Sequence, residues 1–297
     1  MPCRGIALSL MLTAAASVAL ALRLPTTPDA ATAENYRGEA GRLLERARQG
    51  DTEAELRLGW MLEHGQGLAQ NYALARDWYE KAAQAGNPAA QNNLGALLAK
   101  GLGGAQDNAG AVRWYLRAAV NGLAAAQNNL GYMYSTGQGI NLDVAEAARW
   151  YSKAADQNFP PAEANLAYFY NIGRGVPQDP ARAAELYRRA AEAGYVPAEE
   201  NVAGMYAQGR GVPRDLAAAA LWLRRAAERG SATAENNLGF AYEHGLGVLR
   251  DRTMSLFWYK KAAVQGLAEA QRNLHILQQQ ATPQAASPQV SNTQSFH

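Results

Sequence analysis

The feature that most constrains the fold is a period of 36 residues that runs through the chain without insertion or deletion. Seven apolar residues are each 36 positions apart: Leu58, Leu94, Leu130, Leu166, Val202, Leu238 and Leu274. Six Gly-x-Gly pairs, from Gly65/Gly67 to Gly245/Gly247, keep the same step. A fixed period of this length is typical of a repeated supersecondary unit. We therefore expect a solenoid built from one unit stacked many times.

Each repeat predicts two helices. With Asp51 as position 1, positions 4, 8 and 12 are apolar and form one stripe of a first helix, which the glycine at position 15 ends. Asn or Asp at position 21 is an N-cap for a second helix, which carries mostly Trp-Tyr at positions 28 and 29 and Ala-Ala at 32 and 33. Gly or Asn at position 36 ends that helix. Small residues at position 9 predict a close approach of the two helices.

One such hairpin cannot bury its aromatic stripe alone, whereas stacked hairpins bury it continuously. We therefore interpret the Trp-Tyr series as core; a set of ligand-stacking rings is the alternative. Glu or Gln recurs at position 5 and Asn at position 7, which predicts hydrogen bonds between repeats. The cations at position 31 form a column that we expect on a solvated outer face, or facing an acidic partner.

The residues resemble the Sel1-like repeat, a relative of the tetratricopeptide repeat. The pattern is A-[EQ]-x-x-L-G-x-x-Y-x-x-G-x-G, then [DN]-x-x-x-A-x-x-W-Y-x-[KR]-A-A-x-x-G. Departures are Gly104, Leu186, Leu223 and Asn158, which affect packing only. The resemblance implies an all-α protein, an α/α superhelical solenoid of stacked helix hairpins.

The domain organisation follows from the register of the repeats. We expect a signal peptide at 1–33, an N-terminal capping helix at 34–50 (roughly Tyr36 to Arg48), a C-terminal capping helix at 267–280 and a disordered tail at 281–297. The six repeats between the caps are 51–86, 87–122, 123–158, 159–194, 195–230 and 231–266.

The first residues predict export. An apolar run from Ile6 to Leu22 follows Arg4, and cleavage is expected after Ala33, with Ala21 as an earlier candidate. The predicted location is periplasmic or secreted; the alternative is a chain anchored by its N-terminus to the inner membrane. Cys3, the one cysteine, would be lost on cleavage, so disulfides would not stabilise the exported protein.

The residue inventory predicts no enzyme. We expect no cofactor and no metal, because the sequence has no nucleophile triad, phosphate loop or Cys-His cluster, and His64 and His244 are five repeats apart. A histidine near a helix C-terminus is favoured by the helix dipole alone. The net charge of +2 without a basic block argues against nucleic acid binding.

The resemblance implies where a partner would bind. In the tetratricopeptide relatives the first helices line a concave groove that holds peptides or partner helices. The matching positions predict a protein-binding groove lined by Trp60, Asn92, Asn128, Tyr132, Tyr168, Glu200, Asn236, Phe240 and Arg272. The alternative is that these aromatic side chains pack between neighbouring first helices.

We therefore predict an exported, non-enzymatic protein-interaction scaffold of the bacterial envelope, a monomer that binds a protein or peptide. The alternative is an envelope protein that binds peptidoglycan or β-lactams, possibly a hydrolase, although no residue supplies its nucleophile. A third alternative is an adaptor of a eukaryotic secretory pathway.

Overall fold

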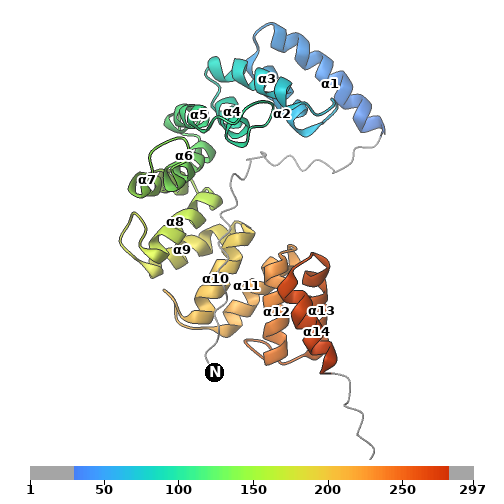
Figure 1. Cartoon of the computed structure of the whole chain (residues 1–297), viewed down its shortest axis with the longest axis vertical. Helices are drawn as coiled ribbons and strands as arrows, with labels where there is room; N and C mark the ends of the chain where they lie inside the picture. The colour runs from blue at the N-terminus through green and yellow to red at the C-terminus, as the bar shows by residue number, and fades with distance from the viewer. Residues whose placement is uncertain (1–29, 281–297) are drawn as a thin grey trace, which may run out of the picture. The chain divides into compact units, whose positions relative to one another are not determined.

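The computed structural model describes residues 30–280, with side chains from residue 38 onward, and within this range it contains fourteen helices and no strand (Figure 1). They are α1 (Ala30–Arg48), α2 (Thr52–His64), α3 (Tyr72–Gln84), α4 (Pro88–Lys100), α5 (Asn108–Val120), α6 (Ala124–Thr136), α7 (Val144–Ala155), α8 (Pro160–Ile172), α9 (Pro180–Glu192), α10 (Val196–Gln208), α11 (Leu216–Glu228), α12 (Ala232–His244), α13 (Arg252–Val264) and α14 (Ala268–Gln279). The even-numbered helices are the first helices of the repeats. The all-α prediction is confirmed.

The chain divides into two compact units. Unit 1 contains the residues up to 198 and residues 210–212, and unit 2 contains residues 199–209 and those from 213 onward. In unit 1 each helix from α1 to α8 packs on the next one in the sequence, and in unit 2 the same holds from α11 to α14. Consecutive helices therefore form the antiparallel hairpins of a solenoid. No helix in the described part of the chain is long and apolar enough to span a membrane.

Helix α1 begins earlier than expected, at Ala30 and not near Tyr36. Its first turn is rich in alanine, the residue with the highest helix propensity. The expected cleavage position after Ala33 therefore lies inside α1. The apolar run from Ile6 to Leu22 and the expected tail at 281–297 lie outside the described residues.

The predicted helix ends are confirmed. At all six positions 21 the Asn or Asp side chain accepts a hydrogen bond from the backbone of its own helix, as Asp143 does from the Glu146 amide at 2.9 Å. The first helices end on glycines with left-handed backbone, for example Gly137 at φ 71°. Asn158, which replaces glycine at position 36, adopts φ 55°, a conformation that asparagine tolerates better than most residues.

The core lies between the two helices of each hairpin, and most of the tyrosines at position 29 lie deep within it. Tyr79, Tyr115, Tyr151, Tyr187 and Tyr259 are almost fully buried. The small residue at position 9 makes room for them: a Cβ at Gly131 would lie 2.9 Å from the ring of Tyr151. The predicted close approach is confirmed.

The second glycine of five Gly-x-Gly pairs has a role that the sequence did not reveal. Gly139 has φ 69°, and a Cβ there would lie 2.7 Å from the backbone nitrogen of Ala109 in the preceding repeat. Gly103, Gly175, Gly211 and Gly247 make the same approach to a preceding second helix. This glycine therefore lets the turn of one repeat rest directly on the backbone of the repeat before it.

Candidate protein-interaction surface

A ladder of asparagine side chains joins neighbouring first helices. Asn129 donates to the side-chain oxygen of Asn92 at 2.9 Å, and Asn165 donates in the same way to Asn128 at 2.9 Å. In unit 2, Asn273 donates to Asn236 at 3.0 Å. Each bond runs from position 7 of one repeat to position 6 of the repeat before it. The predicted inter-repeat role of position 7 is thus confirmed.

The ladder changes what three of the expected groove residues can do. Asn92, Asn128 and Asn236 are buried, and their side-chain oxygens accept the ladder bonds. They are not available as a row of amides for an extended peptide. The sequence pointed to position 6 because the matching positions face the groove in the tetratricopeptide relatives. In this chain the asparagines at position 6 bond to the next repeat.

The aromatic side chains at position 10 remain accessible. In unit 1, Trp60, Tyr132 and Tyr168 are half-buried on α2, α6 and α8. Tyr132 and Tyr168 lie on neighbouring first helices, since the Asn165–Asn128 bond joins α6 to α8. Each ring therefore packs on one side and is open to solvent on the other, a state between the two alternatives that the sequence left open.

Unit 2 exposes more apolar surface at the same position. Phe240 on α12 is 45% exposed and Ile276 on α14 is 51% exposed. The Asn273–Asn236 bond links these two helices, so both side chains belong to one row. Arg272 is exposed on α14, whereas Glu200 on α10 is half-buried and accepts a hydrogen bond from the Ser231 hydroxyl. Burial raises the pKa of the Glu200 carboxyl.

Two histidines extend the aromatic row, and sequence reasoning missed them. His64 stacks on Trp60 with ring centroids 4.5 Å apart, and His244 stacks on Phe240 at 4.1 Å. In both, Nδ1 donates to the backbone oxygen of the aromatic residue, at 2.9 and 3.1 Å, so Nε2 is left to face solvent. The signal was the spacing of four residues between ring and histidine on one helix face.

Position 5 has two different roles. Its glutamines bond between repeats, as Gln91 does to the Ala83 oxygen at 3.1 Å and Gln127 to the Ala119 oxygen at 3.1 Å. Its glutamates pair within their own repeat: Glu163 with Arg189 at 2.5 Å, and Glu235 with Lys261 at 3.1 Å. The expectation of inter-repeat bonds thus holds for glutamine and is wrong for these two glutamates, because a carboxylate has no proton to donate to a carbonyl.

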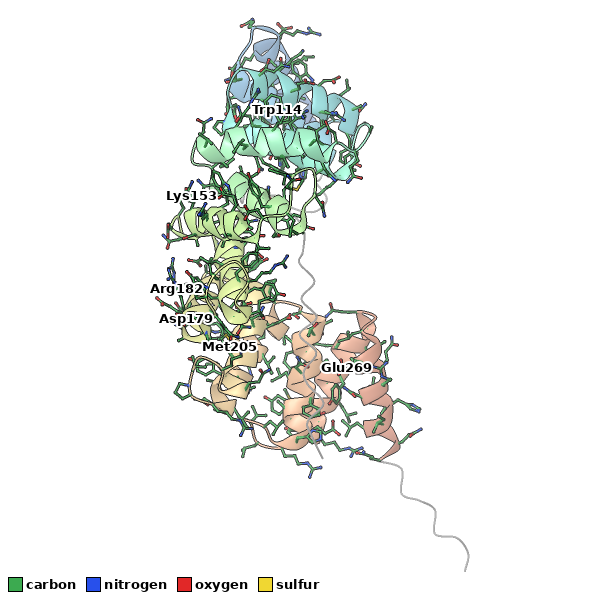
Figure 2. The ribbon with its side chains drawn as sticks, turned by 60° about the vertical axis from the view of Figure 1, so that its left-hand side comes forward. Trp114, Lys153, Asp179, Arg182, Met205 and Glu269 are labelled. Carbon is green, nitrogen blue, oxygen red and sulfur yellow. The ribbon has the colours of Figure 1, made fainter. Side chains whose placement is uncertain are left out.

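The cation column of position 31 lies against the tryptophans of position 28. Lys81, Arg117, Lys153, Arg225 and Lys261 each lie over the Trp of their own repeat, at 4.1 to 4.9 Å from the ring centroid. Trp114 and Lys153, members of this series, are labelled in Figure 2. The cations therefore lie over the tryptophan rings at the margin of the core. The prediction of a solvated face did not include this contact with the rings.

The described residues hold no group of three His, Cys, Asp or Glu side chains placed to bind a metal ion. The expected groove residues also bring no nucleophile and base together. What the first helices offer is aromatic and aliphatic surface with a few polar groups beside it, which suits contact with another chain.

Comparison with known proteins gives the family. The Sel1 repeat model matches six consecutive stretches, at 52–87, 88–123, 124–159, 160–195, 196–231 and 232–267. The chain belongs to the Sel1 repeat family. These matches begin one residue after the repeats assigned from the sequence. Sel1 repeat proteins are generally non-enzymatic scaffolds for protein–protein interaction.

Two solved structures are similar to this Sel1 repeat protein. One is c5321 of uropathogenic Escherichia coli, a protective antigen with the same repeat fold, with 36% identity, a TM-score of 0.71, and coverage of 81% of this chain and 51% of that one. The other is a Sel1 repeat protein from Oxalobacter formigenes, with 34% identity, a TM-score of 0.71, and coverage of 77% and 92%. The chain thus spans about half the length of the E. coli protein. A comparison with curated proteins gave no match.

Proposed function

We propose that this Sel1 repeat protein is an exported, non-enzymatic scaffold of the bacterial cell envelope that binds a protein or peptide on its first helices. The observation that carries the proposal is the row at position 10. The aromatic side chains at position 10 stay accessible to solvent, whereas the asparagine side chains at positions 6 and 7 are hydrogen-bonded within the protein. Partly exposed aromatic residues are the side chains that most often dominate the energy of protein interfaces.

We propose one binding patch in each unit: Trp60, Tyr132 and Tyr168 in unit 1, and Phe240 and Arg272 in unit 2. His64 and His244 belong to these patches because they stack on Trp60 and Phe240. Rings held by an internal stack lose little side-chain freedom when a partner binds, which favours affinity. Recognition would be mainly apolar, with the Arg272 guanidinium as a charged contact.

Export rests on the N-terminal sequence and on one relative. The segment with Arg4 and the run from Ile6 to Leu22 has the form of a secretory signal. The E. coli relative is a protective antigen, which is consistent with an exported location. We propose a periplasmic or secreted monomer, with cleavage after Ala33 or Ala21. N-terminal sequencing of the exported protein tests this, and an intact Met1 in the envelope fraction would favour an anchored form.

The binding surface is tested by affinity capture from an envelope extract. The wild-type chain is compared with the variant Tyr132→Ala, Tyr168→Ala, Phe240→Ala. The matched control is Leu116→Ala, Leu221→Ala, Phe257→Ala, because these exposed side chains lie on second helices and remove a similar apolar surface. A protein that binds wild type and control but not the first variant supports the proposal. A partner that binds all three equally places the site elsewhere.

A further inference from the structure

Two turns of unit 1 carry an arginine between their glycines. Arg174 and Arg210 stand at the middle position of Gly-x-Gly, where the other four repeats have glutamine or leucine. Each side chain reaches back to the first helix of the preceding repeat. Arg174 donates to the backbone oxygen of Ser135 at 2.6 Å and lies over the ring of Phe169, 5.5 Å from its centroid. Arg210 donates to the backbone oxygen of Asn171 at 2.6 Å, so the same contact recurs one repeat later.

These arginines lie near the two tyrosines of the position-10 row. Ser135, which accepts from Arg174, follows Tyr132 by less than one helical turn, and its hydroxyl donates to the Tyr132 backbone oxygen at 2.8 Å. Both side chains act on the buried hydroxyl of Tyr151: burial raises its pKa, Tyr132 raises it further and the charge of Arg174 lowers it. The same set recurs one repeat later as Arg210, Tyr168 and Tyr187. Each arginine is therefore a neighbour of one ring of the row.

The residue in the turn varies together with the ring at position 10. Tyr132 and Tyr168 are each followed, in the turn of the next repeat, by arginine. Trp60 is followed instead by Leu102, and these two side chains pack half-buried against the same apolar cluster. The tryptophan end of the row thus has an apolar border, whereas the tyrosines have a cationic one.

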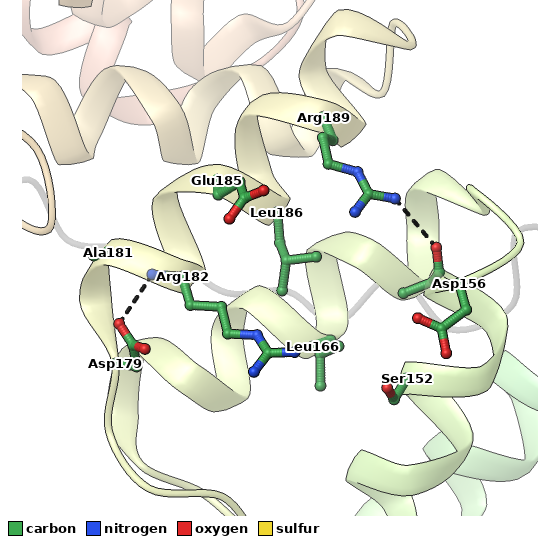
Figure 3. A pocket seen from close by; sticks show the side chains of 10 residues that line it. Ser152, Asp156, Leu166, Asp179, Ala181, Arg182, Glu185, Leu186 and Arg189 are labelled. Atoms are coloured by element: carbon green, nitrogen blue, oxygen red, sulfur yellow. Dashed lines mark hydrogen bonds between the residues drawn. The ribbon is translucent and has the colours of Figure 1, made fainter.

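The charge of both arginines is left largely uncompensated. Neither guanidinium pairs with a carboxylate among the side chains that the structure describes, and both residues are half-buried. A helix C-terminus offsets only about half an elementary charge, and one bond to a carbonyl leaves other N–H donors of a guanidinium unused. Arg189 differs, because it pairs with the buried Glu163 and donates to the Ala155 backbone oxygen at 3.4 Å (Figure 3).

We propose that the patch of unit 1 binds an extended acidic segment of a partner protein, and that two of its Asp or Glu carboxylates pair with Arg174 and Arg210. This inference rests on the proposed function and names the chemistry of the partner. Packed helices are about 8–10 Å apart. A polyproline II segment rises about 3.1 Å per residue and presents every third side chain on the same side. Two carboxylates three positions apart therefore span the two arginines, with the residues between them near Tyr132 and Tyr168.

The test uses a displayed library of random peptides selected on the full chain at low salt. Peptides that bind wild type but not the variant Tyr132→Ala, Tyr168→Ala report on the patch. We expect these peptides to share two Asp or Glu residues three positions apart. They should bind the variant Arg174→Gln, Arg210→Gln at least about tenfold more weakly, because charge-assisted bonds between guanidinium and carboxylate are the stronger ones.

The substitution by glutamine is chosen to preserve the turns, since Gln66 and Gln138 stand at this position in two other repeats. Circular dichroism and the melting temperature check the fold of the variant. The matched control is Arg113→Gln, Arg149→Gln, which removes two exposed cations from the second helices α5 and α7 of the same unit. The control should bind the selected peptides like wild type, and an equal loss in both variants would overturn the assigned contacts.

A second measurement needs no change in the protein. Replacing both acidic residues of the best peptide by Gln or Asn should weaken its binding to wild type at least about tenfold. The difference should shrink at about 1 M salt, where the screening length is about 3 Å. Patch-dependent peptides without the acidic pair, or with equal affinity after this replacement, would overturn the acidic partner and leave the patch itself supported. If no peptide depends on the patch, the inference is wrong, and the capture from envelope extract decides the proposed function separately.

Discussion

Asn165 donates its side-chain amide to the side-chain oxygen of Asn128, 37 residues earlier, at 2.9 Å. The separation is one repeat plus one residue, so the bond joins position 7 to position 6 of the preceding first helix. Because Asn128 is buried, the bond forms away from bulk water, where an unmade hydrogen bond costs most. Bonds of this kind set the register between repeats.

We expect Asn128→Ala to lower the free energy of unfolding by about 1–3 kcal/mol, because it leaves the Asn165 amide without its partner. Asn165→Ala should cost a similar amount. The double variant should cost less than the sum, with a coupling of about 0.5–3 kcal/mol measured by urea unfolding. Strictly additive losses would show that the two side chains do not stabilise each other.

The second glycine of Gly-x-Gly, at position 17 of the repeat, and the glycine at position 36 provide a matched comparison of the cost of adding a side chain. Gly139 and Gly122 both have positive φ, at 69° and 86°, but only Gly139 faces the backbone of the preceding repeat. Gly122→Ala should cost about 1–2 kcal/mol for the left-handed conformation alone. Gly139→Ala adds a collision with Asn108 and Ala109, so its loss in thermal stability should be clearly larger. Equal losses would mean that the contact between repeats is loose.

Much of the fold could be predicted from the sequence because the determinants recur. Asp143 at a helix start, Gly137 at a helix end and Gly131 opposite Tyr151 depend on contacts within one hairpin. Those contacts follow from helical periodicity and capping. The period of 36 residues then implied stacking.

The contacts between repeats were harder to predict. The offset of one residue that joins Asn165 to Asn128 depends on how two hairpins are shifted against each other, which a repeat pattern does not contain. For the same reason asparagine at position 6 was interpreted as a binding residue. Leu186 breaks the series of tryptophans at position 28, but the sequence does not show how α7 and α9 pack around it.

Glu163 makes stability depend on pH. Burial raises the pKa of its carboxyl above the usual value of about 4.5, although Arg189 acts in the opposite direction. A raised pKa in the folded state means that this carboxyl contributes most to stability below about pH 4.5, and that the contribution is lost as pH rises through the folded pKa.

Glu163→Gln removes this titration. We expect the stability of wild type relative to Glu163→Gln to increase as the pH falls from 7.5 to about 5, measured as urea midpoints at each pH. Glu228→Gln, at an exposed position, controls for the general effect of removing one negative charge. A relative stability that stays constant or decreases toward low pH would show that Arg189 outweighs burial.

The most direct test of the scaffold function is site-specific photo-crosslinking in cells. A benzophenone side chain replaces Tyr168 in the position-10 row or, as the control, Arg113, which is exposed on the second helix α5. The account predicts that irradiation joins one discrete envelope protein to the chain from position 168 and not from position 113. Crosslinking of that protein from position 113 alone, or from neither position, would contradict binding on the first helices.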